Sequence, residues 1–254
     1  MARAALLGRL TWRVATVTAL RDETPTARTL VLQVPGWPGH DAGQHVDVRL
    51  TAPDGYRAVR SYSIASVPAG DRVELTVDQV VDGEVSPDLA RVLAVGDRVE
   101  LRGPVGGWFV WRPDQSEPVQ LVAGGSGVVP VMCMLRSHAE AGSGAPVQFL
   151  YSARTPGSVI YRDELDRLAG SVPITYAYTR VAPPGWPRPP GRVGADVVDA
   201  ATFAPALTPA CYVCGPTGFV ETVADLLVQA GHDPARIRTE RFGPSASDRV
   251  EGPR

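Results

Sequence analysis

The sequence predicts a protein of two domains, an antiparallel β-barrel at the N-terminus followed by an α/β domain built on a parallel sheet. Two observations lead to this fold class. Between residues 10 and 112, short segments alternate apolar and polar side chains and are separated by turn sequences such as "PDG" and "PAGD". Between residues 118 and 244, continuous apolar runs alternate with helical patterns, as they do around parallel sheets. A chain of 254 residues with 44% hydrophobic content is long enough for two domains and a substantial core.

The composition excludes several classes of protein. A net charge of -2 gives no electrostatic basis for binding nucleic acid or an anionic membrane surface. No stretch approaches the ~20 apolar residues of a membrane span, and the apolar run near the N-terminus is shorter than the roughly 7–15 residues of a signal peptide. Three cysteines, an odd number, argue against a disulfide framework and for a reducing compartment. We therefore expect a cytoplasmic protein that does not insert into membranes.

Three segments of the N-terminal part, residues 44–50, 71–79 and 96–103, have the period of half-buried strands. Their apolar positions are Val46, Val48 and Leu50, then Val73, Leu75 and Val77, then Val99 and Leu101. The segment "SPDLARVL", residues 86–93, interrupts this pattern and predicts a short helix. Residues 111–118, "WRPDQSEP", are polar and flanked by proline, which predicts a linker between the domains.

The C-terminal part alternates four predicted strands with three predicted helices. The strands cover residues 119–125, 146–154, 172–180 and 210–215. The helices cover residues 129–142, 161–170 and 216–231, and the last of them carries Val220, Val223 and Leu227 on one face. Ligand sites of such parallel sheets lie at the carboxyl ends of the strands. Residues 181–192 are too rich in Pro and Gly for a regular element and predict an ordered loop or flap, and residues 245–254 predict a disordered tail.

Glycine-rich turns follow two of these strands. In "VAGGSGVVP", Gly124, Gly125 and Gly127 stand between a strand and a helix, where backbone amides can approach a pyrophosphate and the helix dipole favours negative charge. A tight strand–helix turn that binds nothing would also require glycine. A nucleophile elbow of the form G-x-S-x-G is excluded, because Val128 stands where the second glycine would be.

The second turn, "CGPTG", ends the last strand at the same edge of the sheet. Gly215 and Pro216 predict a sharp turn that exposes Cys214 at the strand tip. A purely structural turn is the alternative. A metal site at "CYVC" is not expected, since a closed zinc site needs four ligands and the chain has no second pair.

Taken in order and spacing, "RSYS", "GEVS", "GGSGVVP", "CGP" and the terminal "ERFG" resemble the ferredoxin–NADP reductase superfamily. The resemblance extends from Trp12 to Pro244. It is closest to the bacterial branch that includes the reductase components of ring-hydroxylating oxygenases and the reductase half of flavohemoglobins. It implies a flavin-binding barrel over residues 10–112 and a pyridine-nucleotide domain over residues 118–244.

The resemblance implies specific roles in the barrel. Arg60 would hold the flavin phosphates, Tyr62 would pack on the isoalloxazine ring, and the Ser63 hydroxyl would hydrogen-bond near flavin N5. A guanidinium fork suits phosphate oxygens, and a phenol offers flat apolar area with a polar tip. The segment with Gly83, Val85 and Ser86 would open a short helix whose amides receive the pyrophosphate. FAD is the expected cofactor and FMN the alternative.

In the second domain, the resemblance implies that Phe242 covers the flavin face opposite the tyrosine, and that Cys214 and Glu240 support hydride transfer together with Ser63. The residues expected to bind the nicotinamide nucleotide are Gly124, Gly125, Ser126, Gly127, Cys214, Gly215 and Pro216. The strand that ends in "YSARTPG" has no acid for a ribose 2′-hydroxyl, whereas Arg154 suits a 2′-phosphate. Arg180 and Arg192 flank the Pro-rich loop and could add charge. These arginines favour NADPH over NADH.

The implied activity is that of a flavoprotein oxidoreductase. NAD(P)H would reduce bound FAD by hydride transfer, and the electrons would pass to a separate acceptor such as a ferredoxin or a metal-containing oxygenase component. The three cysteines do not have the C-x₄-C-x₂-C spacing of a plant-type iron–sulfur domain. Two alternatives stay open from the sequence: direct reduction of a small molecule or oxygen, and a flavin- or nucleotide-binding subunit without turnover.

Overall fold

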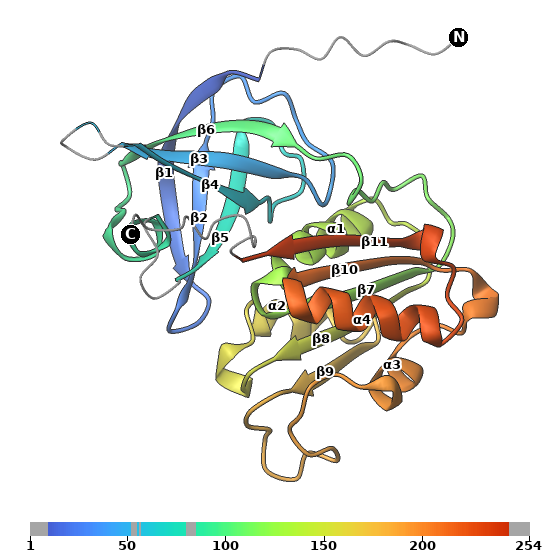
Figure 1. The fold of residues 1–254 in the computed structure, drawn as a ribbon. Helices are drawn as coiled ribbons and strands as arrows, with labels where there is room; N and C mark the ends of the chain where they lie inside the picture. Colours follow the sequence, from blue (N-terminus) through green and yellow to red (C-terminus); the bar gives the residue numbers. More distant parts are fainter. Residues whose placement is uncertain (1–9, 52–54, 56, 80–84, 244–254) are drawn as a thin grey trace, which may run out of the picture.

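A computed structural model describes residues 10–51, 55, 57–79 and 85–243, which form an antiparallel sheet followed by a parallel sheet (Figure 1). The six antiparallel strands lie in the order β4-β3-β6-β1-β2-β5. Their bounds are β1 Trp12–Asp22, β2 Ala27–Gln33, β3 His45–Thr51, β4 Arg57–Ser63, β5 Arg72–Asp78 and β6 Arg98–Val105. This confirms the predicted antiparallel domain.

The antiparallel sheet closes on itself between its two edge strands. Ile64, directly after β4, forms a β-bridge with Leu75 of β5, and the Ala65 amide donates to the Glu74 carbonyl at 2.8 Å. The interior is filled from alternate strand positions, as the period of the sequence predicts. The predicted short helix is present as a five-residue segment, Asp88–Val92, whose Leu89 packs into this core.

The parallel sheet has five strands in the order β11-β10-β7-β8-β9, and every neighbouring pair is parallel. Their bounds are β7 Val119–Gly124, β8 Val147–Ala153, β9 Ile174–Tyr178, β10 Ala210–Pro216 and β11 Ile237–Phe242. The first four were predicted from the sequence. The fifth, β11, was not, and it adds an edge strand that carries two of the expected site residues.

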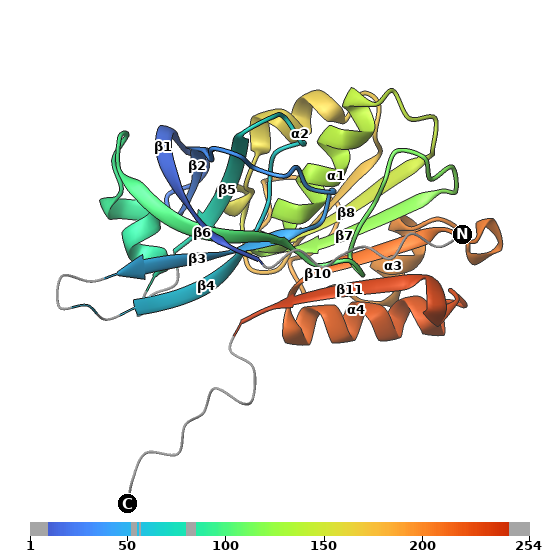
Figure 2. The ribbon, with the colours of Figure 1, turned by 90° about the horizontal axis from the view of Figure 1, so that it is seen from above.

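Helices cover both faces of the parallel sheet (Figure 2). The helices are α1 Val128–Glu140, α2 Arg162–Leu168, α3 Ala195–Ala201 and α4 Thr217–Gln229, of which α3 was not predicted. One apolar core joins α1 and α2 to the sheet, and a second joins α3 and α4 to the opposite face. The first core also contains Ala27, Ala42 and Ala65 of the barrel, so α1 packs directly on the antiparallel domain.

Two connecting segments, residues 111–118 and 181–192, are held in place by contacts of their aromatic side chains. Trp111, in the predicted linker, is 1% exposed and forms a β-bridge with Ala42, so this segment is built into the domain contact. The Pro-rich loop, residues 181–192, contains no helix or strand, as predicted, and its Trp186 ring stands edge-on to Tyr178 at 5.1 Å. The predicted tail at 245–254 lies outside the described residues. No helix in the described ranges has the length and apolar content required to cross a membrane.

Candidate functional site

Three residues expected to act together meet where the parallel sheet faces the barrel. The Ser63 hydroxyl, at the end of β4, donates a hydrogen bond of 3.2 Å to Glu240 Oε1 on β11. Cys214 of β10 is the register partner of Glu240. Ser63 and Glu240 are 177 positions apart in the chain, so only the docking of the two domains brings them together.

The unpredicted strand β11 places the C-terminal residues at this site. It runs parallel to β10 with its carboxyl end directed at the barrel (Figure 1). Phe242 is the register partner of Pro216, and it packs partly buried against the core that includes α1. Glu240 and Phe242 lie on the same face of β11, because side chains two positions apart in a strand point to the same side.

The expectation that Cys214 is exposed at the strand tip was wrong, since its exposed fraction is 0%. The cause is the close approach of the glycine turn after β7. A Cβ atom on Gly127 would stand 2.2 Å from the Cys214 carbonyl oxygen, so only glycine allows this turn to cover the strand end. Burial, and after it the charge of Glu240, raises the pKa of the Cys214 thiol well above its ordinary value. The thiol is therefore neutral and is not an activated nucleophile.

Glu240 is the titratable group of the site that changes charge near neutral pH. Burial raises the pKa of its carboxyl group to about 7, and the hydrogen bond from Ser63 opposes this rise by favouring the ionised form. A carboxyl group with such a pKa can hold or release a proton under physiological conditions. It can do so directly beside the Ser63 hydroxyl.

The raised pKa of Glu240 predicts a specific dependence of stability on pH. Between about pH 4.5 and pH 7 the folded protein keeps a proton on Glu240 that the unfolded chain has lost. The contribution of Glu240 to the free energy of unfolding therefore falls as pH rises through this window and is constant above it. Replacing Glu240 by Gln removes this contribution. Denaturant titrations of the cofactor-free protein should show that the wild type loses about 3 kcal/mol more than Glu240→Gln between these pH values. Identical pH profiles for the two proteins would contradict the buried carboxyl group.

The three residues of "RSYS" lie on β4, the edge strand that leads to Ser63. Arg60 is exposed, and its guanidinium donates to the Val59 carbonyl at 2.8 Å. Tyr62 packs partly buried against the barrel core, and burial raises its pKa to about 12, so the phenol keeps its proton and can donate a hydrogen bond. A guanidinium, a phenol and a hydroxyl on one strand make a donor set that fits a phosphate, a flat ring and a ring nitrogen.

The expected pyrophosphate segment of the barrel is only partly described. Gly83 lies outside the described residues. Val85 and Ser86 are buried directly before the helix Asp88–Val92, and the Val85 carbonyl accepts from the Leu89 amide at 3.1 Å. Their role toward a flavin stays a prediction.

The two glycine turns pack against each other at the carboxyl edge of the parallel sheet. Gly125–Gly127 form a single helical turn before α1. Gly215 has φ +153°, and a Cβ atom there would stand 2.9 Å from the Gly124 carbonyl oxygen. The glycines thus allow close contact of the two turns. This supports the alternative that the turns require glycine for packing. At Gly125, whose φ is +55°, a Cβ atom would meet only open space, so the left-handed backbone rather than close packing favours glycine there, and its role toward a nucleotide stays a prediction.

The arginines expected to select the coenzyme gather at the same edge. Arg154 is exposed directly after β8, and its carbonyl accepts from the Arg180 amide at 3.0 Å. The Gly191 amide donates to the Tyr178 carbonyl at 2.9 Å, which returns the Pro-rich loop to the end of β9 beside Arg192. Arg154, Arg180 and Arg192 therefore flank one sheet edge.

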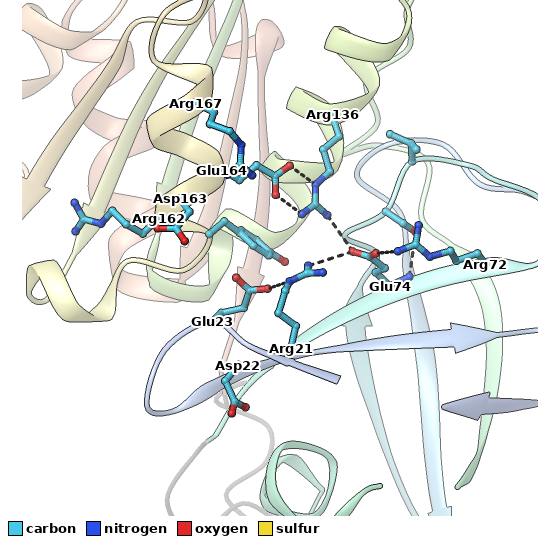
Figure 3. A pocket seen from close by; sticks show the side chains of 13 residues that line it. Arg21, Asp22, Glu23, Arg72, Glu74, Arg136, Arg162, Asp163, Glu164 and Arg167 are labelled. Atoms are coloured by element: carbon cyan, nitrogen blue, oxygen red, sulfur yellow. Dashed lines mark hydrogen bonds and ion pairs between the residues drawn. The ribbon is translucent and has the colours of Figure 1, made fainter. Parts of the chain in front are cut away.

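Sequence reasoning missed a group of buried polar residues on the barrel. Strand alternation predicts that Glu74 and Thr76 of β5 face solvent, but they are only 6% and 5% exposed because Arg136 of α1 and Tyr161, directly before α2, cover them. A cavity of about 630 Å³ opens beside them between the barrel and α2 (Figure 3). The described residues that line it do not include Ser63, Cys214 or Glu240. A single sequence carries no signal for this region, because the covering residues come from the other domain.

Comparison with known proteins gives matches over both parts of the chain. The family description "oxidoreductase FAD-binding domain" matches residues 15–110, and "oxidoreductase NAD-binding domain" matches residues 121–225. Ferredoxin–NADP reductase B of Sorangium cellulosum is 36% identical over 212 residues, which cover 80% of this chain and 85% of that protein. The ferredoxin–NAD(P)⁺ reductase component of the naphthalene 1,2-dioxygenase/salicylate 5-hydroxylase systems of a Ralstonia species is 28% identical over 238 residues, covering 91% and 69%.

Solved structures agree with the sequence matches. The flavohem-like FAD/NAD-binding domain of nitric oxide dioxygenase from Vibrio cholerae superposes with a TM-score of 0.81 at 25% identity. The superposition covers 91% of this chain and 99% of that one. The chain spans only about half the length of several curated relatives, between 53% and 57% for three of them.

Proposed function

Because this chain belongs to the ferredoxin–NADP reductase family and carries its FAD-binding and NAD-binding domains, we propose that it takes electrons from NAD(P)H and passes them through FAD to a separate acceptor. One observation carries the proposal. Ser63 from the FAD-binding part meets Glu240, the neighbour of Cys214, from the NAD-binding part. The two binding domains therefore converge on one small polar site.

The cofactor would supply the redox chemistry, accepting a hydride from nicotinamide C4 at flavin N5. The residues of the chain bind, orient and exclude water. Arg60 would hold phosphate, Tyr62 and Phe242 would cover the ring, and the Ser63 hydroxyl, which donates to Glu240 in this structure, would turn to donate near N5. Glu240 holds or releases a proton beside Ser63. The buried Cys214 thiol is neutral, fills the space next to Glu240 and does not act as a nucleophile. FAD rather than FMN is the cofactor of this proposal, in keeping with the family match.

The acceptor in this proposal is a ferredoxin or an oxygenase component. The Ralstonia relative is named as the reductase component of dioxygenase and hydroxylase systems, which supports this class of partner.

All three cysteines of this chain are buried free thiols. We place the protein in the cytoplasm, where NAD(P)H is available, with domain limits at residues 10–112 and 118–244.

Steady-state turnover tests the acceptor. NAD(P)H oxidation should be fast with a one-electron acceptor such as ferricyanide or a ferredoxin, and at least about tenfold slower with oxygen alone. The reverse order of rates would favour direct reduction of oxygen or a small molecule. No turnover with any acceptor would favour a binding subunit.

Replacing Arg154 by Ala tests the coenzyme preference. A charged hydrogen bond to a 2′-phosphate contributes roughly 1.5–3 kcal/mol, so the half-saturating NADPH concentration should rise about 10- to 100-fold while that for NADH changes less than about threefold. The measurement is flavin reduction at varied coenzyme concentration. Arg167→Ala, an exposed arginine on α2, is the matched control and should leave both values unchanged. Equal losses for NADPH and NADH with Arg154→Ala would overturn the preference.

A further inference from the structure

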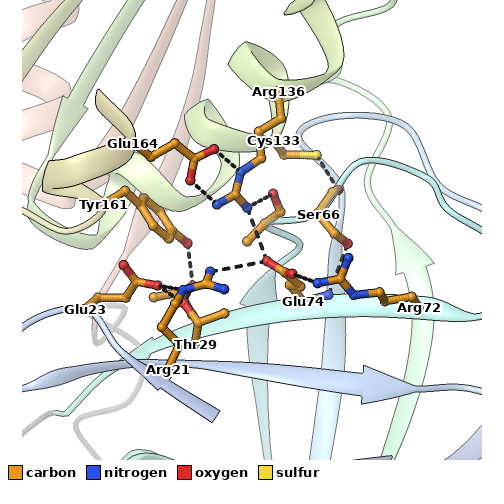
Figure 4. Close-up of polar contacts among 12 residues, drawn as sticks. Arg21, Glu23, Thr29, Ser66, Arg72, Glu74, Cys133, Arg136, Tyr161 and Glu164 are labelled. Carbon is orange, nitrogen blue, oxygen red and sulfur yellow. Dashed lines mark hydrogen bonds and ion pairs between the residues drawn. The ribbon is translucent and has the colours of Figure 1, made fainter. Parts of the chain in front are cut away.

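One arginine of the nucleotide-binding part connects both domains through polar contacts (Figure 4). Arg136 lies on α1, and only 15% of its side chain is exposed. Its guanidinium donates to both carboxylate oxygens of Glu164 on α2, at 2.8 and 2.6 Å. It also donates to the Ala65 carbonyl at 2.8 Å and lies 3.4 Å from Glu74 Oε2, both on the barrel. The Arg136 guanidinium thus binds α2 on one side and the barrel on the other.

The barrel side of this contact is a buried carboxylate. The Glu74 side chain is 7% exposed and forms ion pairs with Arg72, Arg136 and, at 3.6 Å, Arg21. Glu23 accepts from Arg21, so three arginines and three glutamates form one cluster at the interface, with Arg136 and Glu164 on one side and the other four on the barrel (Figure 4). A buried ion pair contributes little net stability, because desolvation offsets the attraction. What such a pair can do is fix the geometry of the groups that it joins.

The same face of α1 holds the backbone that follows the flavin motif. The Cys133 thiol donates to the Ser66 carbonyl at 2.9 Å, and His40 Nε2 donates to the same oxygen at 2.8 Å. The Ser66 hydroxyl accepts from the Glu74 amide at 3.0 Å. Residues 64–66 continue directly from Ser63, so their position determines where the end of β4 lies relative to α1.

The other end of α1 is the glycine turn. The helix begins at Val128, immediately after Gly125–Gly127, and continues through Arg136. Tyr161, whose φ is +61°, forms a second contact between the domains beside that of Arg136. Its ring lies 5.0 Å from the Arg136 guanidinium, and its hydroxyl donates to the Thr76 hydroxyl on β5. One rigid helix therefore joins the turn expected to bind the nucleotide to the strand expected to bind the flavin.

We infer that Arg136 is a positioning residue for hydride transfer: by pinning residues 64–66 and Glu74 to α1, it sets the spacing between the flavin-binding strand and the nucleotide-binding turn. This inference rests on the proposed function. Arg136 touches neither ligand, so it acts through the backbone that it holds. Displacement of reacting groups by as little as about 1 Å can slow an enzyme about 100-fold.

Replacing Arg136 by Met keeps the apolar length of the side chain and removes the polar bridge. In stopped-flow experiments on the FAD-loaded full chain, the limiting rate of flavin reduction should fall about 10- to 100-fold. The half-saturating NAD(P)H concentration and the FAD content should change less than about threefold, because no ligand contact is lost. Arg136→Lys retains one charged donor that reaches either Ala65 or Glu164, and its rate should lie between those of Met and the wild type.

A second readout needs no cofactor. The Ala65 amide bonds to the Glu74 carbonyl, and the Glu74 amide bonds to Ser66 Oγ, so both amides report on the pinned segment. Hydrogen exchange at these two amides in the cofactor-free protein should accelerate at least about tenfold in Arg136→Met, while amides in the core of the parallel sheet keep their rates.

Arg72→Met is the matched control. Arg72 pairs with the same carboxylate, but both residues lie on β5, so its loss leaves the bridge between the domains in place. This variant should reduce flavin at the wild-type rate. An Arg136→Met protein that melts earlier but keeps the wild-type limiting rate and exchange rates would overturn the inference, as would equal slowing by Arg72→Met. A wild type that NAD(P)H does not reduce would refute the proposed function instead, and the exchange experiment would still decide the positioning claim.

Discussion

Replacing Arg60 by Ala should lower the affinity for FAD about 100-fold. A guanidinium that holds phosphate oxygens through charged hydrogen bonds contributes about 3 kcal/mol, and each 1.4 kcal/mol is a factor of ten in the dissociation constant. Arg60 is exposed on the edge strand β4, where such a ligand can reach it. Titration of the cofactor-free protein with FAD, followed by flavin fluorescence, measures this directly.

Two further variants on the same strand sharpen the result. Arg60→Lys should recover part of the affinity, because an ammonium group supplies the charge but not the two-pronged geometry. Arg57→Ala removes another exposed arginine of β4 and should leave the affinity within about threefold of the wild type. FAD binding by Arg60→Ala that matches the wild type would exclude Arg60 from the phosphate site.

The second large effect is on stability and concerns Gly127. A Cβ atom there would stand 2.2 Å from the Cys214 carbonyl oxygen and 2.7 Å from the Gly215 amide nitrogen, and neither backbone atom can move aside without shifting β10. We expect Gly127→Ala to lower the free energy of unfolding by about 3 kcal/mol, at the upper end of typical overpacking costs. Urea titration of the cofactor-free protein measures this loss.

Gly144→Ala is the control for this effect. A Cβ atom at Gly144 would have no heavy atom within 4 Å, so the unfolding free energy should change by less than about 1 kcal/mol. A loss of less than about 1 kcal/mol in Gly127→Ala as well would contradict the close packing of the two glycine turns.

The periodicity of the sequence was sufficient to predict the two sheets. Val46, Val48, Val73 and Leu75 point into the barrel as their alternation predicts, because only one face of each strand can reach the core. The strands around Leu121 and Val213 are apolar on both faces, which is typical of a parallel sheet covered by helices. These patterns are local, and so a single sequence reveals them.

Elements with weak local patterns were not predicted. Strand β11 reads "IRTERF", in which charged residues stand at three of the positions of an edge strand, so it shows neither clear alternation nor an apolar run. Helix α3 has seven residues, too few for a helical period to stand out. Both elements are fixed by the sheet and the helix on which they pack.

The residues of the candidate site could be proposed from motifs, but their surroundings could not. Ser63, Cys214 and Glu240 lie close together, and their joint role in hydride transfer stays a prediction. The burial of Cys214 depends on the packing of two turns that lie far apart in the chain, and the bridge through Arg136 depends on the contact between domains. Contacts of that kind join residues distant in the chain, and no local pattern encodes them.

Anaerobic mixing of the purified protein with NADPH or NADH tests the central claim most directly. The protein should bind FAD in a ratio of about one to one and appear yellow, and stoichiometric coenzyme should bleach the flavin within seconds by transfer of two electrons. Readmission of a one-electron acceptor should restore the oxidised spectrum. A colourless protein that does not take up added FAD, or bound FAD that stays oxidised with both coenzymes, would contradict the claim.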